Sequence, residues 1–257
     1  MKKVELGGHK VVLYDSIDEL PMVRFHRFNK MLLVDAGVGS EIGDFDAHIE
    51  RAVRYIRNND RDSAAKELDN LRQNVFLILS EQSTKDLSFA CLVKEIDGKP
   101  CDDLSDEGLR EVLQTLGGVP RGEVAAEMEA AKKKIDGDLI LYFSGIFDDV
   151  TVREFYDVMK RRAVAMLDGI IEGDTEQRKG DIDALTEKMI LYTKPRVFSG
   201  RRSVEVQHDK DYESLCLTIS KQTGADAKRM TVLEFYNAYE YIRRMAKETQ
   251  KKPAKSR

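Results

Sequence analysis

Apolar residues recur every three or four positions along most of this chain, and this spacing constrains the fold more than any other feature. In the segment from 42 to 78 they form two stripes, separated by the polar turn at 58–63. The two stripes contain Ile42, Phe45, Ile49, Ala52, Val53 and Ile56, and then Ala64, Leu68, Leu71, Val75 and Ile78. Such spacing places apolar side chains on one face of an α-helix. The segment therefore predicts two antiparallel helices joined as a hairpin.

The same spacing predicts helices over residues 16–34, 105–116, 121–147 and 176–192. The stripe of the longest one is Val124, Met128, Ala131, Ile135, Leu139, Tyr142 and Ile146. This helix is expected to run through Gly137, at a cost of roughly 1 kcal/mol. The scarcity of proline, 5 residues in 257, agrees with a chain dominated by helices.

Two short segments contain turn sequences that are typical of β-hairpins. Residues 2–14, KKVELGGHKVVLY, alternate around Gly7 and Gly8, and residues 87–104 contain the tight-turn pair Asp97 and Gly98. The first hairpin is interpreted as a flap on the core or as an edge offered to a partner. The predicted fold class is mainly α: antiparallel helical hairpins with one or two small β-hairpins.

The helix start VTVREFYDVMKRR at Val150 is echoed by MTVLEFYNAYEYIRR at Met230. The shared residues are Thr151, Val152, Glu154, Phe155 and Tyr156, and in the echo Thr231, Val232, Glu234, Phe235 and Tyr236. A Thr followed three residues later by Glu is the capping-box pattern, so Thr151 and Thr231 are predicted N-caps. Either these are two amphipathic helices whose similarity is partly chance, or they are a repeated unit that docks an aromatic pair in a groove.

Charge is distributed unevenly along the chain. The net charge is −4, but residues 243–257 carry +6 and the rest of the chain −10. An acidic body with a basic tail argues against general nucleic-acid binding, although the tail alone could contact phosphate or an acidic partner. One side of the helix predicted at 16–34 is also basic and is expected to be solvated or to meet an acidic neighbour or phosphate. Its basic residues are Arg24, His26, Arg27 and Lys30.

Residues 198–209, FSGRRSVEVQHD, interrupt the helical spacing and predict an extended connector. We therefore expect a main helical body with the N-terminal β-hairpin over residues 1–198. A second unit over 199–257 would contain the connector, a C-terminal helix pair and the basic tail. The first helix of that pair is expected to be short, with Tyr212, Leu215, Cys216 and Ile219 on its apolar face.

The residues that could carry chemistry are scattered. The nearest approaches to a metal cluster are His208 with Asp209 and Asp211, and His48 with Asp44 and Asp46. Neither has the paired spacing of a zinc site or the length of a calcium loop. The sequence also lacks the GxSxG, Walker and dinucleotide-binding motifs. We therefore expect no enzyme, no cofactor and no metal, with a site assembled only in three dimensions around His208, Cys216 or acidic pairs as the alternative.

Cysteine content and hydropathy limit the compartment. Cys91, Cys101 and Cys216 are an odd number without close pairing, which argues for a reducing environment. No apolar run approaches the ~20 residues of a membrane-spanning helix, so no membrane contact is expected.

Several segments, taken in order after the N-terminal hairpin, resemble a group of phage proteins. The segments are YDSIDELPMVRFHRFNK at 14–30, IDGKPCDDLSDEGL at 96–109 and MTVLEFYNAYEYI at 230–242. They are similar to hypothetical proteins from the structural gene blocks of tailed phages that infect gut Bacteroidales. The last helix also resembles the C-terminal helices of siphophage tail assembly chaperones. The resemblance implies a virion or assembly role near the neck or tail, in the host cytoplasm during assembly, and it carries over no site residues.

We expect a non-enzymatic structural or assembly protein that packs against copies of itself and against other phage structural proteins. One alternative is a soluble tail-assembly chaperone that is absent from the mature particle, and another is a regulatory adaptor that uses the basic tail on nucleic acid. Because interfaces favour Tyr and Arg, the candidate interface residues are Tyr236, Tyr239, Tyr241, Arg243 and Arg244. Phe235 is expected in the core, and Tyr241, which falls beside the basic cluster, at the interface.

Overall fold

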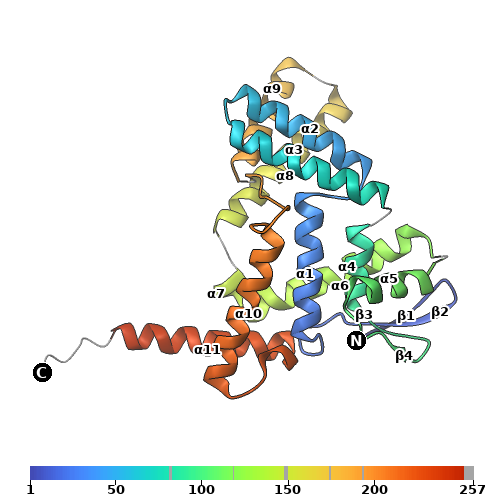
Figure 1. The fold of residues 1–257 in the computed structure, drawn as a ribbon. Helices are drawn as coiled ribbons and strands as arrows, with labels where there is room; N and C mark the ends of the chain where they lie inside the picture. The colour runs from blue at the N-terminus through green and yellow to red at the C-terminus, as the bar shows by residue number, and fades with distance from the viewer. Residues whose placement is uncertain (81–82, 118, 148–149, 174, 193, 252–257) are drawn as a thin grey trace, which may run out of the picture.

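The computed structural model describes residues 1–257 except 81–82, 118, 148–149, 174, 193 and 252–257. The described residues form eleven α-helices, one 3-10 helix and one antiparallel sheet of four strands (Figure 1). The prediction of a mainly α fold with small β-hairpins is confirmed. Among the described helices, none has the length and hydrophobicity needed to cross a bilayer.

The two predicted β-hairpins join in a single sheet. The first consists of β1 (Lys2–Leu6) and β2 (His9–Leu13), and the second of β3 (Val93–Ile96) and β4 (Lys99–Pro100). Strand β2 pairs antiparallel with β3, which gives the order β1-β2-β3-β4. The sequence predicted each hairpin but not their union, because the alternation within a hairpin does not specify a partner strand.

Helix α1 (Met22–Gly37) crosses the middle of the molecule, and three helices pack beside it and the sheet (Figure 1). These are α4 (Thr84–Leu92), α5 (Asp106–Thr115) and α6 (Arg121–Tyr142). The largest fully buried side chains of their shared core include Leu13, Phe28, Phe89, Leu109 and Ile135. The sheet and these helices therefore enclose one hydrophobic core.

The long helix is correctly predicted through Gly137, but it ends earlier than expected. It stops at Tyr142, and the short helix α7 (Ser144–Phe147) follows. Tyr142 is 62% exposed, whereas Phe143 is 1% exposed. The backbone of Phe143 is not helical, and its ring lies in the core, 5.6 Å from the ring of Tyr236. The predicted stripe was wrong at Tyr142, because the chain turns directly after this residue and the ring of Phe143 is buried in the core instead.

The predicted connector at 198–209 is wrong in its second half. Ser203 caps a helix, since its hydroxyl accepts a hydrogen bond from the Val206 amide, and α10 then runs from Val204 to Thr223. This helix is therefore long, not short. A 3-10 turn, Ala227–Arg229, leads into α11 (Val232–Lys251).

Helix α11 begins against the start of α1. The Met22 amide donates to the carbonyl oxygen of Met230 at 2.8 Å, and the Val232 amide donates to that of Leu20 at 2.9 Å. Buried residues of α10 and α11, including Ile219 and Phe235, belong to the same core cluster as Phe28. The core thus crosses the boundary predicted after residue 198, and the division into two units stays a prediction.

The capping prediction is confirmed for Thr231. Its amide donates to Glu234 Oε2 at 2.8 Å, and the Glu234 amide donates to Thr231 Oγ1 at 3.3 Å. The capping box thus starts α11 at Val232. The corresponding prediction for Thr151 lies outside the residues whose side chains the structure describes.

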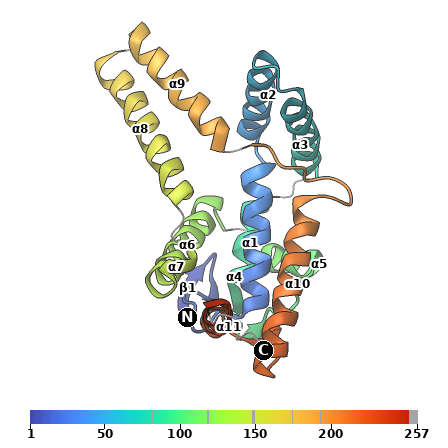
Figure 2. The ribbon, with the colours of Figure 1, turned by 90° about the vertical axis from the view of Figure 1, so that its left-hand side faces the viewer.

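Two helical hairpins extend from the same end of this body (Figure 2). One consists of α2 (Ile42–Arg57) and α3 (Arg61–Leu79), as predicted, and the other of α8 (Val150–Glu172) and α9 (Glu176–Tyr192). The two hairpins touch where Arg54 of α2 pairs with Asp183 and Glu187 of α9. Their outer parts diverge, so both present broad surfaces to solvent.

Arg24 does not lie on a solvated face, which corrects the prediction for the basic side of α1. It is 3% exposed, and its guanidinium donates to the carbonyl oxygen of Val93 at 2.9 Å and to that of Cys101. It also pairs with Asp102 at 3.1 Å. Helical spacing placed Arg24 on the polar side of α1, but α4 and β3 cover that side and supply oxygen atoms to the charge.

Replacing Arg24 by Met should lower the free energy of unfolding by about 3 kcal/mol or more, because buried carbonyl oxygens would lose their donor. Arg27→Met is the matched control. Arg27 pairs with an exposed carboxylate, Asp106, so its replacement should cost less than about 1 kcal/mol. Chemical denaturation of both variants measures the difference, and equal losses would contradict a structural role for the buried guanidinium.

Candidate interaction surfaces and a histidine cluster

The α2–α3 hairpin is attached to the body through buried polar groups. His48 is 1% exposed; its Nδ1 lies 2.6 Å from Glu67 Oε2, and its Nε2 lies 2.9 Å from the carbonyl oxygen of Val38. Arg51 Nε donates to Glu67 Oε1 at 3.0 Å. The buried Asn70 donates to the carbonyl oxygen of Arg196 at 2.9 Å. Of these bonds, those of His48 to Val38 and of Asn70 to Arg196 reach the rest of the chain, whereas Glu67 joins α2 to α3. Apolar contacts complete the attachment, since Leu77 packs on a cluster that includes Phe198, and Tyr55 and Ala64 pack with Ile190.

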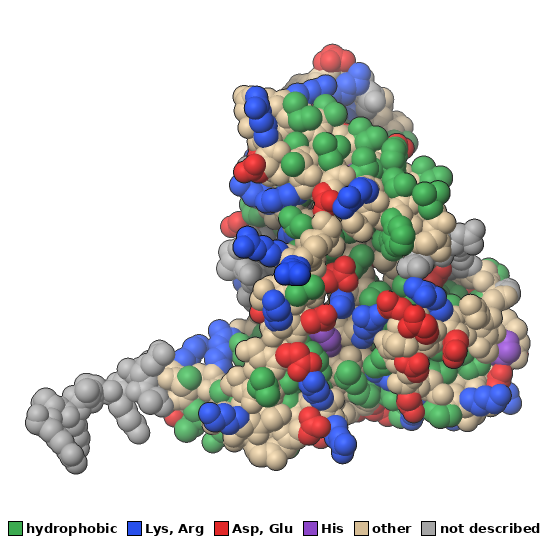
Figure 3. Space-filling model, in the orientation of Figure 1, with side chains coloured by type: hydrophobic (Ala, Val, Ile, Leu, Met, Phe, Trp, Pro, Cys, Tyr) green, Lys and Arg blue, Asp and Glu red, His purple; other side chains and the backbone are tan. Residues whose placement is uncertain are grey.

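Most of the apolar stripe that predicted α2 is exposed, and of the stripe that predicted α3 only Leu68 is exposed. Exposed apolar residues include Ile42, Ile49, Val53 and Ile56 of α2, and Leu68, Phe76 and Leu79 of α3. In Figure 3, hydrophobic side chains gather over these two helices in the upper part of the molecule. Monomeric proteins rarely expose large contiguous apolar patches unless the patch binds something. The hairpin is therefore a candidate interaction surface.

Helix α8 also exposes apolar side chains. Val158 is buried at the contact with α9, whose Leu185 is buried as well. The exposed apolar residues are Tyr156, Met159, Val164, Met166, Leu167, Ile170 and Ile171, with Tyr192 on α9. The apolar face predicted for this helix is thus present, but the described residues leave it uncovered.

The two echoing helices lie in different surroundings. Phe235 is 0% exposed in the core, as expected, whereas its counterpart Phe155 is only partly buried, beside Tyr156 and Tyr192. Tyr156 is 55% exposed. The shared sequence is therefore not accompanied by a shared docking groove, although whether the helices are a true repeat stays a prediction.

The five candidate interface residues separate into two groups. Tyr236 packs on Phe143 and Phe147, with ring centroids 5.6 and 5.1 Å away, and burial raises the pKa of its phenol to about 12. Tyr239 is also partly buried against the core. These two tyrosines hold α11 on the body.

Tyr241, Arg243 and Arg244 form the outward group. Tyr241 is 55% exposed, and the guanidinium of Arg244 lies 5.7 Å from the centre of its ring. Arg243 donates to the carbonyl oxygen of Gly145 at 3.1 Å. The three residues line an open cavity of about 590 Å³, together with Lys247 and one acidic residue, Glu240. An exposed aromatic ring among cations suits an acidic or aromatic partner.

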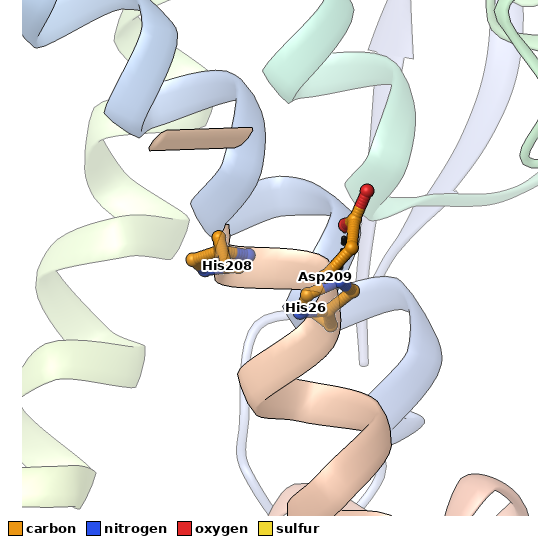
Figure 4. Close-up of side chains that lie close together, drawn as sticks. All are labelled: His26, His208 and Asp209. Carbon is orange, nitrogen blue, oxygen red and sulfur yellow. Dashed lines mark hydrogen bonds and ion pairs between the residues drawn. The ribbon is translucent and has the colours of Figure 1, made fainter. Parts of the chain in front are cut away.

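A histidine cluster lies between α1 and α10 (Figure 4). The His26 ring stacks between those of His208 and Tyr212, with centroids 4.4 and 3.9 Å away. His26 Nε2 lies 3.0 Å from Asp209 Oδ1, and Lys30 Nζ donates to Asp209 Oδ2 at 2.6 Å. The basic side of α1 thus meets an acidic neighbour within its own chain, which was one of the expected outcomes.

His26, His208 and Asp209 have donor atoms within 4.8 Å of one another, a grouping that could hold a metal ion. The sequence placed His208 beside Asp209 but missed His26, since only the packing of α1 on α10 unites them. The ammonium of Lys30 already neutralises the Asp209 carboxylate. Two imidazole rings that stack face to face also direct their nitrogen lone pairs poorly toward one ion. A stacked, hydrogen-bonded clamp between two helices explains this cluster better.

The other groupings that the sequence offered, and that were not expected to be metal sites, lie apart in the described structure. Asp211 pairs with Gln207 within α10, and His48 faces Glu67 and not Asp46. Burial raises the pKa of the Cys216 thiol and raises that of Cys91 to about 12. These thiols are therefore disfavoured as thiolate nucleophiles.

Comparisons with known proteins gave no match to a family model, a curated protein or a solved structure.

The histidine cluster should make stability depend on pH. Burial lowers the pKa of both His26 and His208, although the hydrogen bond to Asp209 partly opposes this for His26. The unfolded chain, with His pKa near ~6.5, then binds more protons than the folded one, so stability should fall as the pH drops from about 7 to 5. In His26→Gln the slope of unfolding free energy against pH should be smaller, and in His26→Gln with His208→Gln smaller again. Unchanged slopes would contradict the clamp.

Truncating the tyrosines of α11 should have unequal effects. Tyr236→Ala removes a ring packed among aromatic neighbours and should cost about 3 kcal/mol of folding stability. Tyr241→Ala removes an exposed ring and should change stability by less than about 0.5 kcal/mol. Thermal melts of the two variants measure this, and a comparable loss in Tyr241→Ala would place that residue in the core.

Proposed function

We propose that this chain is a non-enzymatic structural or assembly protein of a tailed phage, which works near the neck or tail through protein–protein contacts. The observation that carries the proposal is the outward display of apolar side chains by two projecting hairpins. A chain that kept these surfaces bare would risk nonspecific association, so a partner that covers them is the simplest physical reason for their presence.

The composition of the exposed surfaces supports contacts with proteins. Met159 and Met166 of α8, Tyr156 at its start and Phe76 on α3 are of residue types enriched at interfaces. Methionine and aromatic side chains gain much contact area when they are buried. Tyr241 with its adjacent cations supplies a third surface, well separated in the fold from the hairpin ends.

The phage setting is supported by the resemblance of the segments at 14–30, 96–109 and 230–242 to proteins from phage structural gene blocks. Within that setting, the same uncovered surfaces would suit a soluble tail-assembly chaperone, which holds a tail protein before assembly and then leaves. The two roles use the same chemistry and differ in whether the chain stays in the particle.

Copurification tests the proposal. The chain is expressed alone and with candidate neck and tail proteins of the same genome, and each sample is sized by light scattering after gel filtration. We expect stable complexes, weakened by ~2 kcal/mol or more when a residue that anchors the contact, such as Tyr241 or Met166, is changed to Ala. A chain that ignores every such protein would overturn the proposal. Mass spectrometry of purified virions then separates the roles, since many copies exclude the departing chaperone.

A further inference from the structure

The uncovered face of α2 faces away from the rest of the fold. On this helix, His48 and Tyr55 are buried, while Arg54 reaches α9. Ile49 and Val53 lie on the remaining side, 41% and 40% exposed. Helical geometry places Ile42 and Ile56 on the same side, and they are 72% and 56% exposed. The stripe is therefore continuous along the helix and accessible over its whole length.

Helix α3 extends the same face. Its buried polar side includes Glu67, Asn70 and Asn74, and its exposed apolar residues Leu68 and Leu79 lie more than a third of a turn away from that side. Because α2 and α3 are antiparallel, residues that are rotated in the same direction around each helix axis, starting from the contact between the two helices, lie on the same surface of the hairpin. Leu68 and Leu79 thus lie on the same surface of the pair as the α2 stripe, whereas Phe76 is displaced in the opposite sense, and no other described residue is needed to form this two-helix layer.

Charges at the edge of the α2 stripe have opposite signs toward its two ends. Asp46 and Glu50 are exposed in the first half of the helix, and Arg57 is exposed at its end. Suppose that the α2 helix of a second copy lies antiparallel across the stripe, with the crossing point midway between Ile49 and Val53. The acidic end of each helix then faces the basic end of the other. Asp46 of each copy then falls within one residue of the level of Arg57 on the other, and Ile49 falls beside Val53. The pattern is complementary to itself under a twofold rotation.

We propose that two copies of this chain form a dimer through their α2–α3 faces. In this dimer the α2 helices pack antiparallel across a twofold axis, so that two layers of two helices lie face to face. The area is sufficient for such a dimer. A face two helices wide and 16 residues long measures about 24 by 20 Å, so two copies bury roughly 1,000 Å². This inference rests on the proposed function only in holding that the chain acts through protein contacts, and it names one partner, a second copy.

The apolar part of the interface is tested by sedimentation of the whole chain at micromolar concentration. Wild type should sediment as a dimer, and Ile56→Asp should raise the dissociation constant at least tenfold without changing the circular dichroism or the melting of the monomer. Ile170→Asp is the matched control, since Ile170 is an exposed isoleucine (81%) on α8. It should leave the dimer intact. A wild-type monomer, or a dimer lost in Ile170→Asp and kept in Ile56→Asp, overturns the proposal.

The antiparallel arrangement is tested by charge reversal. Asp46→Arg and Arg57→Asp should each weaken self-association, because like charges then face each other at both ends of the helix. An equimolar mixture of the two variants restores both opposite-charge pairs, as does the double variant, so dimers should return in either case. Failure of both to recover would overturn the antiparallel pairing of α2.

The outcomes separate this inference from the proposed function. A dimer that is lost in Ile56→Asp, in a chain that binds no neck or tail protein, leaves the pairing standing and removes the phage role. A wild-type chain that is monomeric but still forms complexes with neck or tail proteins removes the pairing and leaves the phage role standing.

Discussion

The buried guanidinium of Arg24 lies where α1, α4 and the sheet meet, and the arrangement of the body depends on it. It contacts oxygen atoms at the junction of α4 with β3 and just beyond β4. A buried charge is tolerated only when its donors are satisfied, so these elements assemble productively in one relative position. His26 and Lys30, two and six residues further along α1, meet Asp209 of α10. Polar contacts thus join the central helix to its neighbours on two sides.

The α2–α3 hairpin uses polar anchoring in a different way. His48 and Asn70 bond to backbone carbonyl oxygens outside the hairpin, Glu67 joins α2 to α3 within it, and Leu77 and Tyr55 add apolar contacts. Directed bonds hold the hairpin in one orientation while its apolar residues remain outside. Burial of an exposed Leu or Ile is worth about 1.5–3 kcal/mol, and the described structure does not gain this free energy at the outer face of the hairpin. The hairpin is therefore built as a fixed platform and not as part of the core.

Much of the secondary structure could be predicted because helical spacing, capping residues and glycine turns act locally. Spacing identified α2, α3 and α9, and the capping pattern placed the start of α11 at Thr231. What failed depends on packing between distant segments. No local sequence pattern indicates that Arg24 is buried or that the two β-hairpins join in one sheet. The same holds for the contact of His26 with Asp209. Spacing gives the apolar face of a helix but not what covers it, and so the exposure of Ile56 and Ile170 could not be foreseen.

The two echoing helices show how far a local sequence determines structure. Thr231 and Glu234 start α11, but its position depends on contacts of Leu20 and Met22 with the residues on either side of Thr231, which hold the helix so that Phe235 enters the core. Helix α8 carries the same aromatic pair, yet in the described part of the chain it packs mainly on α9 and leaves Tyr156 exposed. The same residues thus support the core in one place and form surface in the other. A pattern of this kind specifies a helix and an apolar face, and the topology around it decides whether that face stabilises the chain itself or binds another molecule.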